Sequence, residues 1–277
     1  MPLSINTNIA SMTAQRSFLE SNNALEQAFE RLSTGKRVNS AVDDAAGLAI
    51  GTDLSSRVRG LEQAVRNVND GISMVQIAEG AYDEVTTIVQ RMRDLAVQAA
   101  NGSLTTTERE YLDSEQGKLA TALDNVMNQA KFGNVDLADG SGVSVVIQSG
   151  AEVSDLTTLV MSASTNDDAD ALNISAAKIN ITTAAGALTS ITAIDTALNT
   201  IAGQRATLGA QQSQLESTVR NLANVAENTA AAAGRIMDTD YAAETANLTK
   251  AQILQQAATS VLAQANAQPQ AVLSLLQ

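Results

Sequence analysis

The stretch that decides the fold is LSSRVRGLEQAVRNVNDGISMV, residues 54–75. Its apolar side chains recur at alternating spacings of four and three residues, at Leu54, Val58, Leu61, Val65, Val68, Ile72 and Val75. Residues three and four apart lie on one face of a helix, so this repeat predicts a long helix whose heptad seam packs against a second helix. We expect these side chains in the core of a helical rod.

The helical pattern continues beyond this stretch. It stops at the turn signal Asn-Gly-Ser of residues 101–103, and Thr107 followed by Glu110 predicts a capping box that opens the next helix. Helices joined by so short a turn are expected to run antiparallel. The same spacing returns after residue 188 and includes Leu208, Leu215 and Leu222, which we also expect in the rod core.

Residues 133–187 differ from the helical segments on either side. They are rich in Gly, Ser, Thr and Asp, and segments 143–148 and 156–161 have the pattern of short strands joined as a hairpin. Because the seam resumes after this insertion, the two helical halves should form one rod. The predicted fold is therefore mainly α, an elongated antiparallel helical coiled-coil rod built from both chain ends, with a small β-hairpin-containing insertion in the middle.

Both chain ends carry apolar side chains at the same spacing. These are Ile5, Ile9, Met12 and Leu19 near the N-terminus, and Leu254, Val261, Val272 and Leu275 near the C-terminus. Residues 251–277 contain no charged side chain. Ordering a residue costs about 1–2 kcal/mol of backbone entropy, and burying a bulky apolar side chain returns about 2 kcal/mol. An isolated chain should therefore keep its ends frayed, and we expect them to fold when neighbouring copies cover these side chains.

Composition excludes most chemistry. The 277 residues include no Cys, His or Trp, and the formal net charge is −13. Disulfides, thiolate sites and His-containing metal sites or triads are excluded, and a basic surface for nucleic acid is missing. We expect no cofactor, no nucleic-acid partner and no membrane span, because no apolar run reaches about 18 residues. The first residues also lack the pattern of a secretory signal peptide.

Residues 31–50, RLSTGKRVNSAVDDAAGLAI, contain two patterns that resemble chemical sites. The Thr-Gly-Lys sequence lacks the earlier Gly and the following Ser or Thr of a phosphate-binding loop. We interpret Gly35 as a helix end, with Ser40 or Asp43 capping the next helix. Asp43 and Asp44 have no neighbouring partner for acid–base catalysis and suit the first turn of a helix, whose dipole favours negative charge.

The insertion holds weaker candidates. Asp167, Asp168 and Asp170 loosely resemble a calcium loop that lacks its characteristic Gly and Glu, so we interpret them as a solvated acidic loop. A metal-dependent hydrolase that uses these carboxylates is the alternative function from the class of enzymes. The sequons at Asn173 and Asn180 carry little weight, because such three-residue patterns are frequent by chance.

The stretch 31–50 resembles the N-terminal signature of bacterial flagellins. The likeness runs from SINTNIASMTAQR through QRMRDLAVQAANG, resumes at IAGQRATLGAQQSQLE, and continues through GRIMDTDYAAETANLTKAQILQQAATSVLAQAN to QAVLSLLQ. The resemblance implies a self-assembling structural subunit of the flagellar filament, used for motility and not an enzyme. It also implies secretion through the flagellar type III export apparatus, with a chaperone, a filament cap and hook–filament junction proteins as partners, and an extracellular location.

The resemblance further implies a division of the chain. Residues 1–42 and 237–277 would form the inner coiled coil with its linker, residues 43–132 and 188–236 the rod helices, and residues 133–187 the short insertion. Large outer domains are not expected, because the insertion is short. The hook–filament junction protein, which shares flagellin-like ends, is the alternative function within this class.

The resemblance implies one recognition surface. Gln90, Arg91, Leu95 and Gln98 match the patch that the flagellin-sensing Toll-like receptor recognises. A Glu of the following helix also belongs to that patch in the family, and we place Lys118 at its position here. This charge reversal predicts weakened recognition by the receptor.

Overall fold

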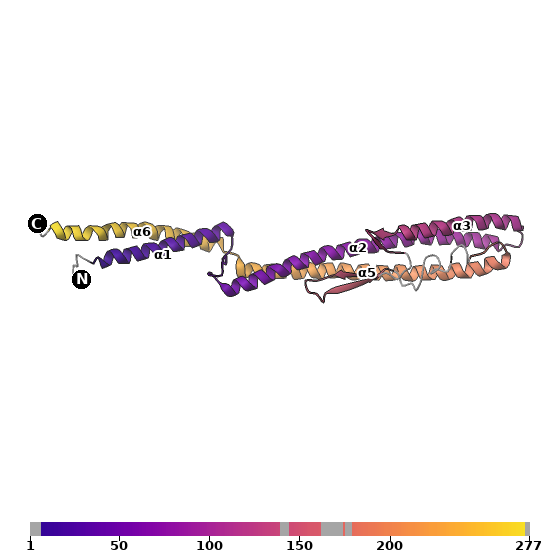
Figure 1. Cartoon of the computed structure of the whole chain (residues 1–277), viewed down its shortest axis with the longest axis horizontal. Coiled ribbons are helices and arrows are strands. Elements are labelled where there is room, and N and C mark those ends of the chain that lie inside the picture. Colours follow the sequence, from indigo (N-terminus) through magenta and orange to yellow (C-terminus); the bar gives the residue numbers. More distant parts are fainter. Residues whose placement is uncertain (1–6, 139–143, 162–173, 175–178, 275–277) are drawn as a thin grey trace. The chain divides into compact units, whose positions relative to one another are not determined.

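The computed structural model describes residues 7–138, 144–161, 174 and 179–274. The helices are α1 (Ile9–Thr34), α2 (Ala45–Ala99), α3 (Thr106–Gln129), α5 (Ala184–Met237) and α6 (Tyr241–Ser274), and the strands are β1 (Lys131–Phe132), β2 (Val135–Asp136), β3 (Ser144–Gln148) and β4 (Leu156–Val160). The predicted mainly α fold with a small β insertion is confirmed (Figure 1). The chain divides into a terminal unit, Met1–Arg57 with Asn228–Gln277, and a central unit, Val58–Glu227.

The central unit is a bundle of α2, α3 and α5. Along α2 one line of buried positions alternates by three and four residues, at Leu61, Ala64, Val68, Gly71, Val75, Ala78, Tyr82, Val85, Val89, Met92, Ala96 and Ala99; Gly51, Met74 and Leu95 are buried as well. Of the seam expected from the sequence, Leu61, Val68 and Val75 are buried. The remaining members, Leu54, Val58, Val65 and Ile72, are only partly buried. In this line the buried positions between Leu61, Val68, Val75 and Tyr82 are small (Ala64, Gly71, Ala78), which lets another element approach α2 closely.

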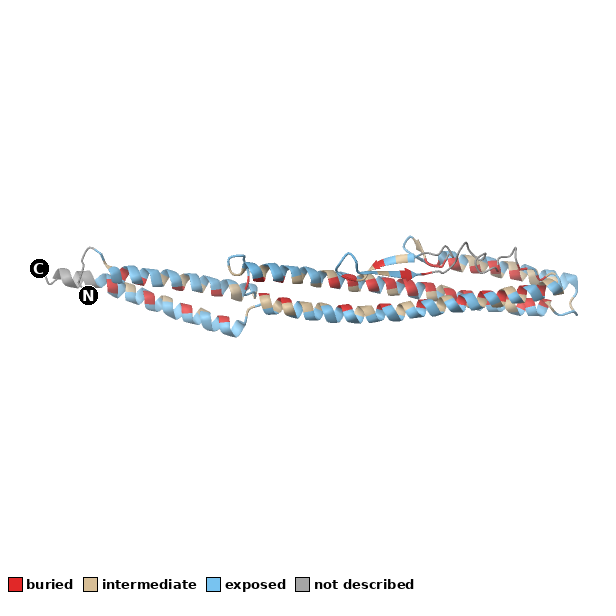
Figure 2. Ribbon diagram, turned by 90° about the horizontal axis from the view of Figure 1, so that it is seen from below, coloured by how far each residue is buried: buried red, intermediate tan, exposed pale blue. Residues whose placement is uncertain are grey.

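Helix α5 runs antiparallel to α2 within this unit. Arg205 of α5 donates to Glu79 of α2 at 2.8 Å, and Arg93, further along α2, donates to Asp195, further back along α5, at 2.7 Å. The side chains of α5 that recur every seven residues, Ile194, Ile201, Leu208, Leu215 and Leu222, are all buried. In Figure 2 the buried residues of this bundle lie on the sides where its helices face one another.

The N-cap of α3 lies two residues before the N-cap predicted from the sequence. It is Thr105, whose hydroxyl accepts from the Glu108 N–H while the Glu108 carboxylate accepts from the Thr105 N–H at 2.7 Å. The prediction of Thr107 with Glu110 is therefore wrong in register. Three consecutive Thr residues offer the same motif twice, and Arg109 favours the earlier start because its guanidinium donates to the Ala99 and Asn101 carbonyls that precede the helix.

Two hairpins follow α3. The predicted one pairs β3 with β4 antiparallel, with Val145 opposite Leu159 and Ile147 opposite Thr157. Its buried face packs on α2 at Gly71, where an added Cβ would lie 2.3 Å from Ile147 Cδ1. The short pair β1–β2, turning at Gly133 with φ +60°, was not predicted. Segment 131–136 is too short to show the alternation that identifies a strand.

Helix α5 begins at Ala184, inside the range assigned to the insertion. The Thr183 side chain accepts from the Gly186 N–H at 3.1 Å and its carbonyl from the Ala187 N–H, so Thr183 is the N-cap. The predicted acidic loop (Asp167, Asp168 and Asp170) and the sequon residue Asn173 lie outside the described residues. Asn180 is described, and its side chain accepts from the Thr182 N–H at 3.0 Å.

Candidate functional site: the terminal helix pair

In the terminal unit, α1 and α6 lie side by side and run antiparallel (Figure 1). Three polar contacts mark the register from one end of the pair to the other. Asn8 donates to the Ala265 carbonyl at 2.7 Å, Gln255 donates to Asn22 at 3.0 Å, and Arg31 lies 3.9 Å from Glu244.

The seam between α1 and α6 is built largely from small side chains. The buried residues among the described side chains are Ser11, Ala14, Ser21 and Ala28 in α1, and Ala251, Ala258 and Ala265 in α6, together with Glu244 in the first turn of α6. The large residues at the intervening heptad positions, Phe18, Leu25, Leu32, Leu248 and Leu262, are partly buried. Small side chains let two helix backbones approach closely. They also bury little apolar area, so the seam by itself stabilises the pair weakly.

The apolar residues predicted for self-assembly lie outside this seam. Ile9, Met12 and Leu19 of α1 are 68%, 58% and 61% exposed, and Leu254 and Val261 of α6 are 47% and 52% exposed. Among the described side chains of the heptad spacing in α6, Ala258 and Ala265 are buried, whereas Leu254 and Val261 are exposed. The spacing pattern could not distinguish the buried seam from the exposed apolar face beside it. Residues displaced by one or three positions from the seam recur with the same heptad spacing as the seam residues. Ile5, Leu275 and the Val272 side chain lie outside the described residues.

Asn8 connects the N-terminal end of α1 to the C-terminal part of α6. Its side-chain oxygen accepts from the Ser11 N–H at 3.0 Å and caps α1, while its amide donates to the Ala265 carbonyl. Pro269 lies inside α6 and has no N–H for that carbonyl, which would otherwise accept from residue 269. Asn8 therefore supplies the donor that Pro269 lacks, a relationship between positions 8 and 269 that no local sequence pattern reveals.

The Thr-Gly-Lys sequence ends α1, as predicted. Gly35 caps the helix in the left-handed conformation, with φ +70°, and its N–H donates to the Arg31 carbonyl at 2.9 Å. The following residues pair with the backbone of the α5–α6 link. Lys36 and Asp238 form an isolated antiparallel β-bridge, and the Thr239 N–H donates to the Gly35 carbonyl at 3.0 Å. The segment therefore ends α1 and holds the α5–α6 link through backbone hydrogen bonds.

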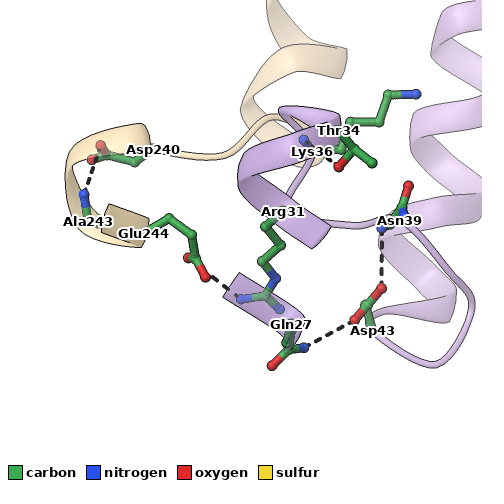
Figure 3. Close-up of polar contacts among 9 residues, drawn as sticks. All are labelled: Gln27, Arg31, Thr34, Lys36, Asn39, Asp43, Asp240, Ala243 and Glu244. Carbon is green, nitrogen blue, oxygen red and sulfur yellow. Dashed lines mark hydrogen bonds and ion pairs between the residues drawn. The ribbon is translucent and has the colours of Figure 1, made fainter. Parts of the chain in front are cut away.

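Asp43 organises the link between α1 and α2 (Figure 3). Its carboxylate accepts from the Ser40 N–H and hydroxyl at 3.0 Å, from the Gln27 amide at 3.2 Å and from the Asn39 N–H at 3.3 Å. These donors, with the Ser40 N–H first, lower the pKa of Asp43 below its ordinary value.

The N-cap of α2 is Asp44, so the prediction of Ser40 or Asp43 in that role is wrong. Asp44 Oδ1 accepts from the Gly47 N–H at 2.8 Å, and its carbonyl accepts from the Leu48 N–H. Both acids suit the cap by residue type. The Asp43 carboxylate already accepts hydrogen bonds from Asn39 and Ser40 in the link, so Asp44 is the acid that caps α2.

The start of α6 is fixed in a similar way. Asp240 Oδ1 accepts from the Ala242 and Ala243 N–H groups, and Glu244, in the first turn, is buried beside Arg31 (Figure 3). A carboxylate in the first helical turn is stabilised by the helix dipole as well as by the guanidinium. The pair therefore ties the C-terminal end of α1 to the N-terminal end of α6.

The residues of the expected receptor patch lie in the central unit. Gln90, Arg91 and Gln98 are exposed, whereas Leu95 is 1% exposed and belongs to the core. The carboxylate that the structure brings to Arg91 is that of Glu115 of α3, at 2.7 Å. Lys118, at the position where the resemblance implies a Glu, is exposed on the next turn of the same helix.

The described residues offer little for chemistry. Among them, no three or more acidic side chains come together in an arrangement that could hold a metal ion. Within the same residues, none of the helices combines the length and apolarity that crossing a membrane requires. The terminal unit instead has an exposed apolar surface, formed by bulky side chains of α1 and α6.

Comparison with known proteins identifies the family. The family model of the bacterial flagellin N-terminal helical region matches residues 5–143, and that of the C-terminal helical region matches residues 191–276. The chain belongs to the bacterial flagellin family. It is similar to a flagellin of Halalkalibacterium halodurans, with 42% identity and 99% of each chain covered, and to flagellin B of Vibrio cholerae, with 35% identity and 100% of each covered. The latter alignment spans 375 positions, so that relative carries sequence that these 277 residues lack.

Two solved structures are also similar. The crystal structure of Bacillus cereus flagellin is 32% identical, has a TM-score of 0.50, and the match covers 61% of this chain and 94% of that one. A putative flagellar hook-associated protein from Vibrio parahaemolyticus has a TM-score of 0.56 at 18% identity, covering 71% and 100%, which shows a shared fold only. The flagellin-family chain is a structural subunit of the flagellar filament that polymerises with itself, and it is not an enzyme.

Proposed function

We propose that the terminal helix pair is the surface through which copies of this chain assemble, with the outer apolar residues contacting neighbouring copies. These outer residues are Ile9, Met12 and Leu19 on α1 and Leu254 and Val261 on α6, and Ile5, Val272 and Leu275 are assigned to the same surface from the sequence. The observation that carries this proposal is the exposure of the described members, between 47% and 68%, on helices whose mutual seam is mostly Ala and Ser.

Contact with neighbouring copies would bury the outer apolar side chains and so stabilise the assembled form. Completing the burial of a half-exposed Leu or Val returns about 1 kcal/mol. A single copy cannot gain this free energy, because its own partner helix covers a different face. In a polymer, each subunit gains it on several sides, so folding of the ends and assembly favour each other.

A charge on this surface tests the proposal. Val261→Glu places a carboxylate where an apolar contact is expected, and should abolish sedimentable filaments while the circular dichroism of the central helices stays unchanged. Gln256→Glu, at an exposed polar position of the same helix, is the matched control and should assemble nearly as the wild type does. Filaments of Val261→Glu at the wild-type critical concentration would show that this face is not an interface.

We also infer which part of the filament each segment of the chain forms. Residues 1–42 and 237–277 form the inner layer of the filament, residues 43–132 and 188–236 form the surrounding helical layer, and residues 133–187 are the insertion on it. Helix ends near these boundaries support the division, since α2 begins at Ala45 and α5 ends at Met237. Limited proteolysis of assembled filaments should cut the insertion and spare both ends.

We propose that the protein is secreted and works outside the cell. Family membership supports export through the flagellar type III apparatus with a chaperone, polymerisation beneath a filament cap, and attachment to hook–filament junction proteins. The test is quantitative mass spectrometry of filaments sheared from cells, in which this chain should be the major component. A trace amount would instead identify a junction protein.

Recognition by the flagellin-sensing Toll-like receptor is the last proposed partnership. Arg91 is exposed and forms an ion pair with Glu115, which supports a contact with the receptor. Lys118 stands where the resemblance implies a Glu, and this reversed charge supports weaker binding of the receptor. Receptor binding by Lys118→Glu should exceed that of the wild type, with Lys250→Glu in α6 as the control. Equal binding by wild type and Lys118→Glu would remove Lys118 from the explanation.

A further inference from the structure

One sulfur atom stands out on the proposed assembly surface. Met12 of α1 is 58% exposed, and its neighbour Ser11 is buried and donates to Asn266 of α6 at 2.8 Å. Successive residues of a helix are rotated by about 100°, so Ser11 facing α6 leaves Met12 directed away from it. Leu19, two helical turns further on, shares this face and is also exposed.

The other methionines that the structure describes are protected. Met74, Met92, Met127, Met161 and Met237 are between 0% and 9% exposed. The sequence contains no Cys that would react faster with an oxidant. Met12 is therefore the accessible sulfur of the described residues, while Met1 lies outside them. This contrast persists if α1 frays, because fraying only increases the exposure of Met12.

The reaction requires only a peroxide. A lone pair of the thioether sulfur attacks the distal oxygen of hydrogen peroxide, the O–O bond breaks, and an S=O bond forms. The sulfur loses two electrons, the peroxide is reduced, and the departing hydroxide takes the proton from the oxygen now bound to sulfur and leaves as water. The product is a polar sulfoxide, which removes an apolar contact and which methionine sulfoxide reductases reverse.

We propose that Met12 is an oxidation site that controls entry of the subunit into the filament. Peroxide converts Met12 of the free subunit to the sulfoxide, and the polar group disfavours burial against a neighbouring copy. In the assembled filament the neighbour covers Met12 and protects it. The inference rests on the proposed function, because it requires the outer face of α1 to be an interface.

The test compares the wild-type chain with Met12→Leu, which keeps the apolar shape and every other methionine, Met1 included. Free subunits of both proteins are treated with graded hydrogen peroxide, mapped by peptide mass spectrometry, and then tested for assembly by sedimentation. The Met12 peptide should gain one oxygen about ten times faster than the peptides of the buried methionines. Wild-type assembly should fall in step with it, while Met12→Leu assembles equally well before and after treatment.

Two further arms sharpen the result. Filaments treated in the same way should show Met12 protected, and reduction of oxidised subunits by a methionine sulfoxide reductase should restore assembly. Oxidation of buried methionines at the same rate as Met12, or equal loss of assembly by Met12→Leu, would overturn the inference. If oxidised wild type assembles normally while Val261→Glu does not, the inference about Met12 fails and the proposed function stands.

Discussion

The contact of Asn8 with the Ala265 carbonyl leads to a prediction that separates two functions of one side chain. Asn8→Ala removes the N-cap of α1, which costs about 1 kcal/mol. It also leaves the Ala265 carbonyl without the donor that Pro269 fails to provide, which costs about 1 kcal/mol because the site is only partly buried. The sum is about 2 kcal/mol, or about a 30-fold rise in the critical concentration for assembly.

Two further variants divide this sum. Asn8→Asp keeps the capping oxygen and loses only the amide donor, so the critical concentration should rise about 5-fold. Pro269→Ala returns a backbone N–H to the Ala265 carbonyl. In that background Asn8→Asp should cost almost nothing, because the carbonyl no longer depends on the side chain.

The assay is the concentration of protein left in the supernatant after filaments of each variant are sedimented to equilibrium. The double-mutant cycle isolates the coupling between positions 8 and 269. If Asn8→Asp raises the critical concentration equally with Pro269 and with Ala at that position, the two residues are independent. The explanation of the Asn8 contact would then be refuted.

Three further predictions concern the link and the central unit. Asp43 has a lowered folded-state pKa, so the stability it contributes is present above the unfolded-state pKa of about 3.9 and is lost as pH falls through the folded value. Thermal melts of wild type and Asp43→Ala should therefore converge below about pH 4, and a constant difference would contradict this. Gly35→Ala forces a side chain into φ +70° and should lower stability by about 1 kcal/mol, measured by urea denaturation, with an unchanged midpoint as the opposing result. Gly71→Ala brings a Cβ within 2.3 Å of Ile147 and should loosen the β3–β4 hairpin in hydrogen exchange, whereas Gly80→Ala, with no atom near its Cβ, should stabilise α2 by up to about 1 kcal/mol. Equal effects of the two glycine variants would rule out the packing argument.

Much of the central unit could be predicted from the sequence. The repeat through Leu61, Val68 and Val75 predicts a helix and one line of its core, because large apolar residues at heptad spacing leave few alternatives. The hairpin of β3 and β4 was equally accessible from its composition. The small buried residues Ala64 and Gly71 were not, since Ala and Gly occur on any helix face and reveal their burial only when the neighbour is known.

The terminal unit was harder to predict for a related reason. The spacing of Leu254, Ala258, Val261 and Ala265 fits one seam, but the structure divides it between a narrow Ala face toward α1 and an exposed apolar face. A period alone identifies a helix and cannot say which of two adjacent stripes meets which partner. The Asn8 contact likewise depends on a carbonyl freed by a proline more than 200 positions away, as the separation of 257 residues between donor and acceptor shows.

The measurement that tests the central claim most directly is hydrogen–deuterium exchange of the full-length chain, first as free subunits and then as assembled filaments. Coupled folding and assembly predicts that amides of α1 and α6 exchange rapidly in the free subunit and become strongly protected in the filament, while those of the buried faces of α2 and α5 are protected in both. If α1 and α6 are equally protected before and after assembly, the ends do not need neighbouring copies, and the account of the outer apolar surface is contradicted.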